Sequence, residues 1–243
     1  MADSFRFKQF SLSNGRAALK VGTDAVLLGA AMTLLPEDRR ALDIGTGTGV
    51  IALMAAQRAP LLSIEAIDID GPSAEEAAYN FRQSPWPDRL RALHCSLSDY
   101  RPESGFDLIF SNPPYYDDSL RNPDERLSAA RHSHALTLAE IFGFASERLT
   151  PDGRISLILP CEKRVPALRL AASFGFRPFR SILVKTVEHK APKRVVLEFS
   201  RRKEAEKQEF ITLMKDGGRS PEYARLTEGF YLDSSQIGRI CHK

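Results

Sequence analysis

The chain has 243 residues, of which 43% are hydrophobic and 27% charged, and its formal net charge is +3. This composition is typical of a globular protein and excludes a disordered, collagen-like or coiled-coil chain. No apolar run approaches the ~20 residues of a membrane-spanning helix, and the first residues lack the apolar centre of a secretory signal. Three widely spaced cysteines predict neither disulfides nor a metal site, so we expect a cytoplasmic protein without membrane contact.

Short apolar runs alternate with helix-like stretches, a pattern typical of parallel strands joined by crossover helices. The helix that ends near Leu149 carries a capping box, because Glu140 follows Thr137 by three residues. The Pro-Asp-Gly turn at 151–153 is expected to begin the fifth strand. We predict strands at 41–44, 63–69, 90–95, 106–110 and 155–159, and helices at 48–59, 72–83, 137–149 and 162–173.

The last two apolar runs, at 181–187 and 194–200, are separated by only six residues. Six residues cannot hold a crossover helix, so this pair is predicted to be an antiparallel hairpin at one end of the sheet. The charge run at 201–209 is expected to be a solvated helix face. The predicted fold class is therefore α/β, a doubly wound and mostly parallel sheet with one reversed strand.

A glycine-rich loop follows the first predicted strand, with the sequence Asp43-Ile44-Gly45-Thr46-Gly47-Thr48-Gly49. Glycines let the backbone turn tightly and approach a ligand closely. The dinucleotide fingerprint is not met, since Val50 occupies its third glycine position, and no phosphate-binding Gly-Lys-Ser/Thr follows. Asp43 would repel a diphosphate but attract an amine. The candidate ligand contacts in this loop are Asp43, Gly45, Thr46, Gly47 and Gly49.

Two further acidic positions suit a nucleoside. Asp68 lies 23 residues after Gly45, near the spacing at which an acid accepts hydrogen bonds from ribose hydroxyls, and Asp70 is the competing candidate. Asp99, after the third strand, can accept a hydrogen bond from the amino group of adenine. A ligand with ribose, adenine and a cationic portion, but no phosphate requirement, is best matched by S-adenosylmethionine.

The fourth strand ends at Ser111-Asn112-Pro113-Pro114-Tyr115. Two prolines stop the strand and fix an extended path at the carboxyl edge of the sheet, where ligands of such folds bind. The Asn112 side-chain oxygen and the Pro113 carbonyl can accept hydrogen bonds from a planar amino group, leaving its nitrogen free to attack a sulfonium methyl. Tyr115 would stack on the substrate base, which must be flipped or unpaired.

These residues resemble the class I S-adenosylmethionine-dependent methyltransferases that modify amino groups, and among them the bacterial tRNA(Val) adenine-37 N6-methyltransferases. Three more stretches carry the closer resemblance, at 20–25, 130–132 and 194–200. The resemblance implies a seven-stranded Rossmann-like sheet with the reversed hairpin last, S-adenosylmethionine as cofactor and tRNA as partner. It places the target adenine against 112–115, and Lys20, Thr23 and Asp24 by the methionine end of the cofactor.

The resemblance also implies three parts: an N-terminal segment over the cofactor site (1–40), the methyltransferase domain (41–200) and a C-terminal appendage (201–243). We expect a monomer that needs no metal. Residues 151–243 hold 19 basic and 11 acidic residues, whereas the first 150 hold 15 and 20, so the last third can attract a polyanion. The candidate RNA contacts are Pro114, Arg131, His132, Lys190 and Lys193.

Three alternatives remain open. Protein glutamine N5-methyltransferases share Asn-Pro-Pro-Tyr, but they usually carry a helical domain ahead of the glycine loop, and only 40 residues precede Ala41 here. Ribosomal RNA guanine-N2 methyltransferases usually have Phe where this chain has Tyr115. A non-catalytic RNA-binding protein with a vestigial cofactor pocket is the third, which the intact Asp43 and Asn112 disfavour.

Overall fold

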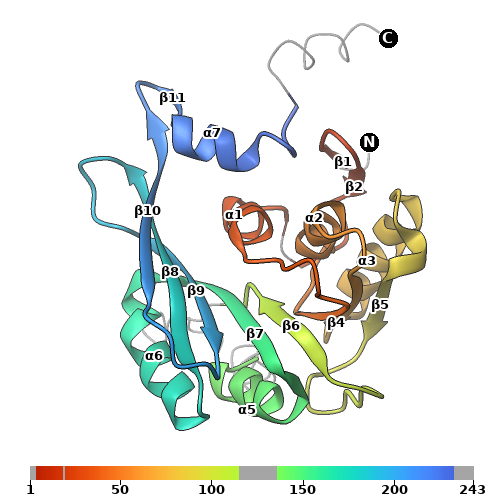
Figure 1. Ribbon diagram of the computed structural model, residues 1–243. Helices are drawn as coiled ribbons and strands as arrows, with labels where there is room; N and C mark the ends of the chain where they lie inside the picture. Colours follow the sequence, from red (N-terminus) through yellow and green to blue (C-terminus); the bar gives the residue numbers. More distant parts are fainter. Residues whose placement is uncertain (1–3, 19, 115–135, 233–243) are drawn as a thin grey trace, which may run out of the picture.

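The computed structural model describes residues 4–18, 20–114 and 136–232. Its centre is a nine-stranded sheet in the order β11-β10-β8-β9-β7-β6-β3-β4-β5 (Figure 1). The fold class is as predicted, whereas the expectation of seven strands is wrong. The strands are β3 (Arg40–Ile44), β4 (Ser63–Asp68), β5 (Leu90–His94), β6 (Phe106–Ser111), β7 (Leu149–Pro160), β8 (Arg177–Val187), β9 (Arg194–Ser200), β10 (Lys207–Lys215) and β11 (Gly218–Arg219).

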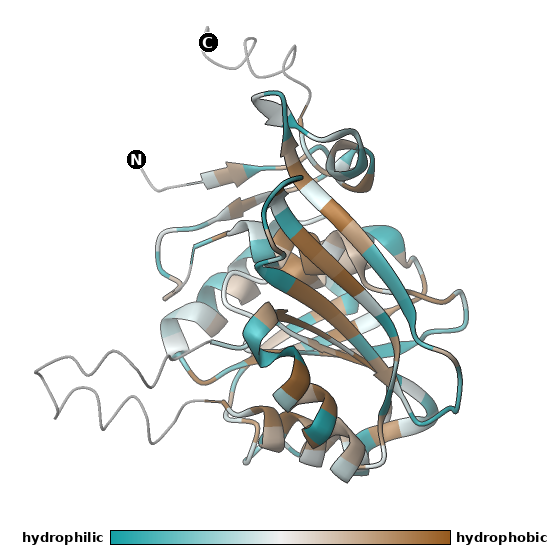
Figure 2. Cartoon of the chain, turned by 90° about the vertical axis from the view of Figure 1, so that its left-hand side faces the viewer, coloured by the Kyte–Doolittle hydropathy of each residue, from teal (hydrophilic) through white to brown (hydrophobic). Residues whose placement is uncertain are grey.

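Helices cover both faces of this sheet. On one face, β-strand residues such as Ala41 and Leu108 pack with three helices, α1 (Thr23–Ala31), α2 (Val50–Arg58) and α3 (Gly71–Gln83). On the other, neighbours such as Leu42 and Ile109 pack with α5 (Leu138–Arg148) and α6 (Arg164–Ser173). Figure 2 looks at this second face and shows apolar residues along the strands behind α6. The two cores arise because successive strand residues point to opposite faces.

The reversed strand of the predicted hairpin is β9, which pairs antiparallel with both β7 and β8, and the short β11 is reversed as well, since it pairs antiparallel with β10. The hairpin of β8 and β9 is thus confirmed, but it does not end the sheet, because β10 pairs parallel with β8. The helix expected over 201–209 is wrong: β10 begins at Lys207. Ile211 packs against the core while Phe210 is 58% exposed, an alternation that suits a strand and not a helix.

The start of β7 also differs from expectation. The strand begins at Leu149, so the Pro-Asp-Gly residues at 151–153 lie inside it. The pairing of β6 with β7 shifts register there, since Phe106 pairs with Leu149 and Leu108 with Arg154. The extra residues form an irregularity that the strand tolerates near the end of its pairing. The capping box of α5 is confirmed, because Glu140 N donates to Thr137 Oγ1 and Thr137 N to Glu140 Oε2.

The N- and C-terminal parts of the described chain meet beside α3 and α7 (Pro221–Thr227). Strands β1 (Ser4–Arg6) and β2 (Ser11–Ser13) form an antiparallel hairpin. Lys8 N donates to Phe230 O at 2.7 Å, and the ring of Phe7 stacks on that of Tyr231. Two 3-10 helices, η1 (Pro87–Arg89) and η2 (Cys161–Lys163), complete the fold. Within 4–18, 20–114 and 136–232, no helix has the length and apolar character needed to cross a bilayer.

Candidate functional site

Three of the predicted site segments meet at one edge of the sheet. Strand β3 pairs in parallel with β4 and β6, so that Ile44 lies between Ile67 and Ser111. Ser111 Oγ donates to Ile44 O at 2.6 Å and ties the ends of β3 and β6 together. Because the carboxyl ends of these strands are aligned, the glycine loop, Asp68 and Asn112 all emerge side by side. This edge is where ligands of doubly wound sheets bind.

The glycine loop adopts a conformation that only glycine accepts easily. Gly45, Gly47 and Gly49 have φ of +71°, +56° and +80°. A Cβ at Gly49 would lie 2.5 Å from the ring of Phe81, so this glycine is required for packing against α3. A Cβ at Gly47 would meet no atom within 4 Å, and one at Gly45 only Leu136 at 3.9 Å. The loop therefore leaves open space at its first two glycines, while the third serves the core.

Asp43 is fully buried beneath this loop. Its Oδ2 accepts a hydrogen bond from Thr46 Oγ1 at 2.7 Å, whereas Oδ1 has no partner among the described residues. Burial raises the pKa of Asp43 to about 7, and the nearby Asp68 adds to this, while Thr46 and the backbone of Ala52 oppose it. A buried carboxylate oxygen without a donor is costly, so this atom suits a ligand that brings one.

The structure separates the roles of Asp68 and Asp70. Asp68 Oδ2 accepts from Gly47 N at 2.8 Å and its Oδ1 from Asp70 N at 2.9 Å, which places its carboxylate against the glycine loop. Burial raises the pKa of Asp68 despite these two donors. Asp70 Oδ2 instead caps α3 by accepting from Ser73 N and Ser73 Oγ. Asp68 is therefore the better placed of the two for a ribose.

Asp99 lies in the turn that follows β5, one strand beyond β4 at the same edge. Its side chain is exposed, and its Oδ2 accepts from Ser96 Oγ at 2.6 Å. The turn is held by Asp99 N, which donates to Ser96 O at 3.2 Å. Asp99 thus stands at the outer side of the edge, where an exposed adenine amino group could reach it.

The proline corner is described through Pro114. Asn112 and Pro114 are half-buried and Pro113 is buried. Tyr115, Arg131 and His132, which were also predicted to act here, lie outside the described residues. The corner follows Ser111 directly, so the hydrogen bond from Ser111 to Ile44 fixes it next to the glycine loop.

The predicted contacts in the N-terminal segment stand at the start of α1. Thr23 is the first helical residue, and Lys20 is exposed just before it. Arg194 Nε donates to Asp24 Oδ2 at 2.7 Å, so two of the stretches that carried the resemblance touch each other. Arg194 pairs with Pro160 at the carboxyl end of β7, which places α1's first turn at the same edge of the sheet.

The loop between β8 and β9 reaches this edge as well. Lys190 N donates to Val187 O at 3.1 Å and Lys193 N to Val184 O at 2.9 Å, which gives the loop a defined turn. Both lysine side chains are exposed. Lysines at this position can contact phosphates without being part of the buried site.

Two polar residues that the sequence did not single out lie one turn apart on α3 and hold the segment around Ser13 next to the glycine loop. Asn80 is buried, accepts from Ser13 N and donates to the carbonyls of Ser13 and Thr48. Glu76 accepts from Ser13 Oγ and from the backbone amides of residues 15–17. Burial would raise the pKa of Glu76, but these donors hold it below its usual value. The only signal in the sequence was a polar pair, four residues apart, on the apolar face of a predicted helix.

Comparisons with known proteins agree with this geometry. A family model described as the methyltransferase small domain matches residues 15–179. The chain is 39% identical to a tRNA1(Val) (adenine(37)-N6)-methyltransferase of Flavobacterium psychrophilum, over 94% of this chain and 99% of that protein. It is 40% identical to the protein of that name from Bacteroides fragilis, over 94% and 97%. The crystal structure of a predicted O-methyltransferase from Agrobacterium tumefaciens shares the fold, with TM-score 0.66, 17% identity and coverage of 85% and 96%.

Proposed function

The chain belongs to the methyltransferase small domain family and, within it, to the tRNA1(Val) (adenine(37)-N6)-methyltransferases, and from this we propose that it methylates N6 of an adenine in tRNA. The proposed substrate position is adenine 37 of the valine tRNA, as the names of these relatives state. The observation that carries the proposal is the meeting of the glycine loop, Asp68 and the Asn112 corner at one edge of the sheet.

The donor set at this edge fits S-adenosylmethionine. The buried Asp43 Oδ1 lacks a partner in the described chain, and the space beside Gly45 and Gly47 is open. Asp68 stands at the loop with a carboxylate that can accept from ribose hydroxyls, and no basic side chain of a phosphate site follows the glycines. When bound, this cofactor supplies an activated methyl group on a sulfonium.

The residues of the edge are proposed to contact different parts of the cofactor. Asp68 and the open glycine positions hold the ribose and the chain of the cofactor, and Asp99 accepts from the adenine amino group. The segment that carries Lys20, Thr23 and Asp24 covers the methionine end. Further contacts from the glycine loop are proposed for Asp43, Thr46 and Gly49.

The Asn112 corner holds the amino group that is methylated. The Asn112 side-chain oxygen and the Pro113 carbonyl would accept hydrogen bonds from its two N–H groups, which leaves the nitrogen lone pair free to face the activated methyl group. Because the prolines fix the backbone, little conformational freedom is lost when the substrate binds. Holding the reacting atoms in line can lower the barrier by up to ~7–11 kcal/mol, so positioning suffices without a nucleophilic side chain.

The proposal is tested by the modified nucleoside itself. The protein is incubated with labelled S-adenosylmethionine and tRNA that lacks the modification, and the tRNA is digested and its nucleosides separated by mass spectrometry. We expect the label in N6-methyladenosine, and its loss when adenine 37 of the valine tRNA is replaced by guanine. Label in N2-methylguanosine, or in glutamine of an added protein fraction, would overturn the assignment.

A further inference from the structure

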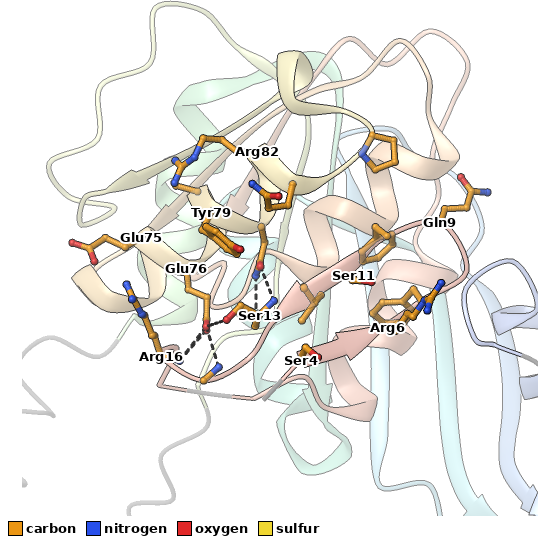
Figure 3. Close-up of a pocket in the computed structure, with 18 of the residues that line it drawn as sticks. Ser4, Arg6, Gln9, Ser11, Ser13, Arg16, Glu75, Glu76, Tyr79 and Arg82 are labelled. Atoms are coloured by element: carbon orange, nitrogen blue, oxygen red, sulfur yellow. Dashed lines mark hydrogen bonds between the residues drawn. The ribbon is translucent and has the colours of Figure 1, made fainter. Parts of the chain in front are cut away.

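A groove of about 1240 Å³ separates the β1–β2 hairpin from α3 (Figure 3). It lies outside the carboxyl-edge site. Its walls carry cations from three elements: Arg6 and Lys8 come from the hairpin, Arg16 from the segment after β2, and Arg82 from α3. Tyr79, which is 49% exposed, lies on the α3 wall. The groove thus combines basic and aromatic side chains, the two features of surfaces that bind nucleic acid.

The groove is lined by more basic than acidic side chains, although residues 1–150 as a whole hold more acidic than basic residues. Two carboxylates line it, Glu75 and Glu76, and Glu76 is occupied by the donors of residues 13–17. Within the described chain, Arg6, Arg16 and Arg82 form no ion pair with a carboxylate. Their guanidinium groups are exposed and available to phosphate oxygens, which they match in geometry.

The groove is rigidly connected to the site. Asn80 bridges Ser13 of β2 and Thr48 of the glycine loop, with bonds of 2.7 to 3.0 Å. Helix α3, which forms one wall, begins directly after the turn that holds Asp68 and Asp70. A polyanion lying in the groove is therefore kept in a constant position relative to the Asn112 corner.

We propose that this groove binds the phosphate backbone of the tRNA, away from the nucleotide that is methylated. The inference rests on the proposed function and extends it, since it names the surface that holds the RNA. Arg6, Arg16 and Arg82 contact phosphates, and Tyr79 packs on a ribose or an unpaired base. The Asn80 bridge then fixes the distance between this contact and the site.

The test is a charge reversal on both walls, Arg16→Glu with Arg82→Glu. We expect binding of unmodified tRNA to weaken at least about 10-fold, and the slope of log affinity against log salt to become shallower by about 2, one for each lost phosphate contact. In the methylation assay, KM for tRNA rises and kcat stays the same. The thermal shift caused by S-adenosylmethionine is unchanged, which shows that the fold and the cofactor site are intact.

The matched control carries the same charge change elsewhere, Arg169→Glu with Arg177→Glu. Arg169 is exposed on α6, on the opposite face of the sheet, and Arg177 is exposed at the start of β8. We expect this control to keep a salt slope close to that of the unmodified protein. Tyr79→Ala should weaken tRNA binding several-fold, while Tyr79→Phe should retain it.

Equal tRNA affinity and salt slope in the groove variant and in its control would overturn the inference and leave the groove to another partner, such as an acidic protein segment. That result is separate from a failure of the proposed function, in which the unmodified protein would methylate no adenine in tRNA. Binding is measured without the methyl transfer, so each of the two statements is tested by its own readout.

Discussion

The two ends of the sheet's carboxyl edge are built differently. At the β3–β4 end, Asp43 is fully buried and Asp68 is held by the glycine loop through a 2.8 Å hydrogen bond. At the β8–β9 end, Lys190 and Lys193 extend from an exposed loop. Buried polar groups keep strong interactions and tolerate few ligands, whereas exposed charges are screened by salt and accept any polyanion. The first end suits one small molecule, and the second suits an RNA backbone.

The largest effect is expected at Asn112, beside the buried region of the edge, because we assign this residue to the methyl transfer and not to the binding of cofactor or tRNA. Asn112→Ala should lower kcat by at least ~100-fold, because the amino group loses an acceptor that orients it for attack. The affinity for S-adenosylmethionine and KM for tRNA should stay within about twofold. Steady-state kinetics of methyl transfer and a titration of the cofactor measure both. A variant with normal turnover would remove Asn112 from the mechanism.

The glycine loop supplies a pair of substitutions that differ in how strongly they disturb the packing of the loop against α3. Gly49→Ala should lower the free energy of unfolding by about 3 kcal/mol, because it combines positive φ with overpacking against Phe81. Gly47→Ala should cost only about 1 kcal/mol, since its Cβ meets no atom within 4 Å. Gly47→Ala should nevertheless weaken cofactor binding about 10-fold or more, because the added Cβ occupies the space proposed for the cofactor. Urea unfolding and cofactor titration distinguish the two, and normal binding by Gly47→Ala would place the cofactor elsewhere.

The buried acid predicts how stability depends on pH. The pKa of Asp43 rises from 3.8 to about 7 on folding, chiefly through burial, so between these values the folded state binds more protons than the unfolded state. The free energy of unfolding of the protein without cofactor should therefore fall as pH rises from about 4 to about 7. The pKa of Asp68 is raised as well and acts with the same sign.

Asp43→Asn supplies the control for this pH dependence, because the amide cannot ionise. The difference in unfolding free energy between the two proteins, measured by urea denaturation from pH 4 to pH 8, removes the contribution of titrating groups that do not interact with Asp43. We expect the slope of this difference to follow the titration of one buried carboxyl. A difference that does not change with pH would mean that Asp43 is not buried as described.

The smallest effect is expected at the exposed end. Lys190→Glu with Lys193→Glu should weaken tRNA binding by about 5-fold and make the salt dependence shallower, while kcat is unaffected. Lys203→Glu with Arg169→Glu is the matched control, since both residues are exposed away from the β8–β9 loop. Filter binding at several salt concentrations measures the slopes. Identical slopes in the two variants would exclude this loop from the RNA surface.

The glycine loop and the Asn112 corner could be predicted because each is a local sequence pattern at the end of a strand. The alternation of strands and helices predicts a parallel sheet, in which these strand ends lie at the same edge. The family resemblance is confirmed by the comparisons, and the hairpin of β8 and β9 by the structure. The preference for Asp68 over Asp70 needed the structure, since it depends on the cap that Asp70 makes for α3.

Other features depended on contacts that the local sequence does not reveal. The charged residues at 201–209 favour a solvated helix face and hide the start of β10 at Lys207, where Ile211 and Leu213 of the same strand pack against the core. Asn80 bonds to Ser13 and Thr48, which lie 67 and 32 positions before it in the chain, so the local sequence around Asn80 does not predict either contact. The basic side chains of the groove come from the β1–β2 hairpin, the segment after β2 and helix α3. Because these segments are far apart in the sequence, no run of charged residues marks the groove.

The most direct test of the central claim is a crystal structure of the protein with S-adenosylmethionine. We expect electron density for the donor between the glycine loop and Asn112, with Asp68 in contact with the ribose. Density at another place, or a donor whose methyl group faces away from Asn112 and Pro113, would contradict it.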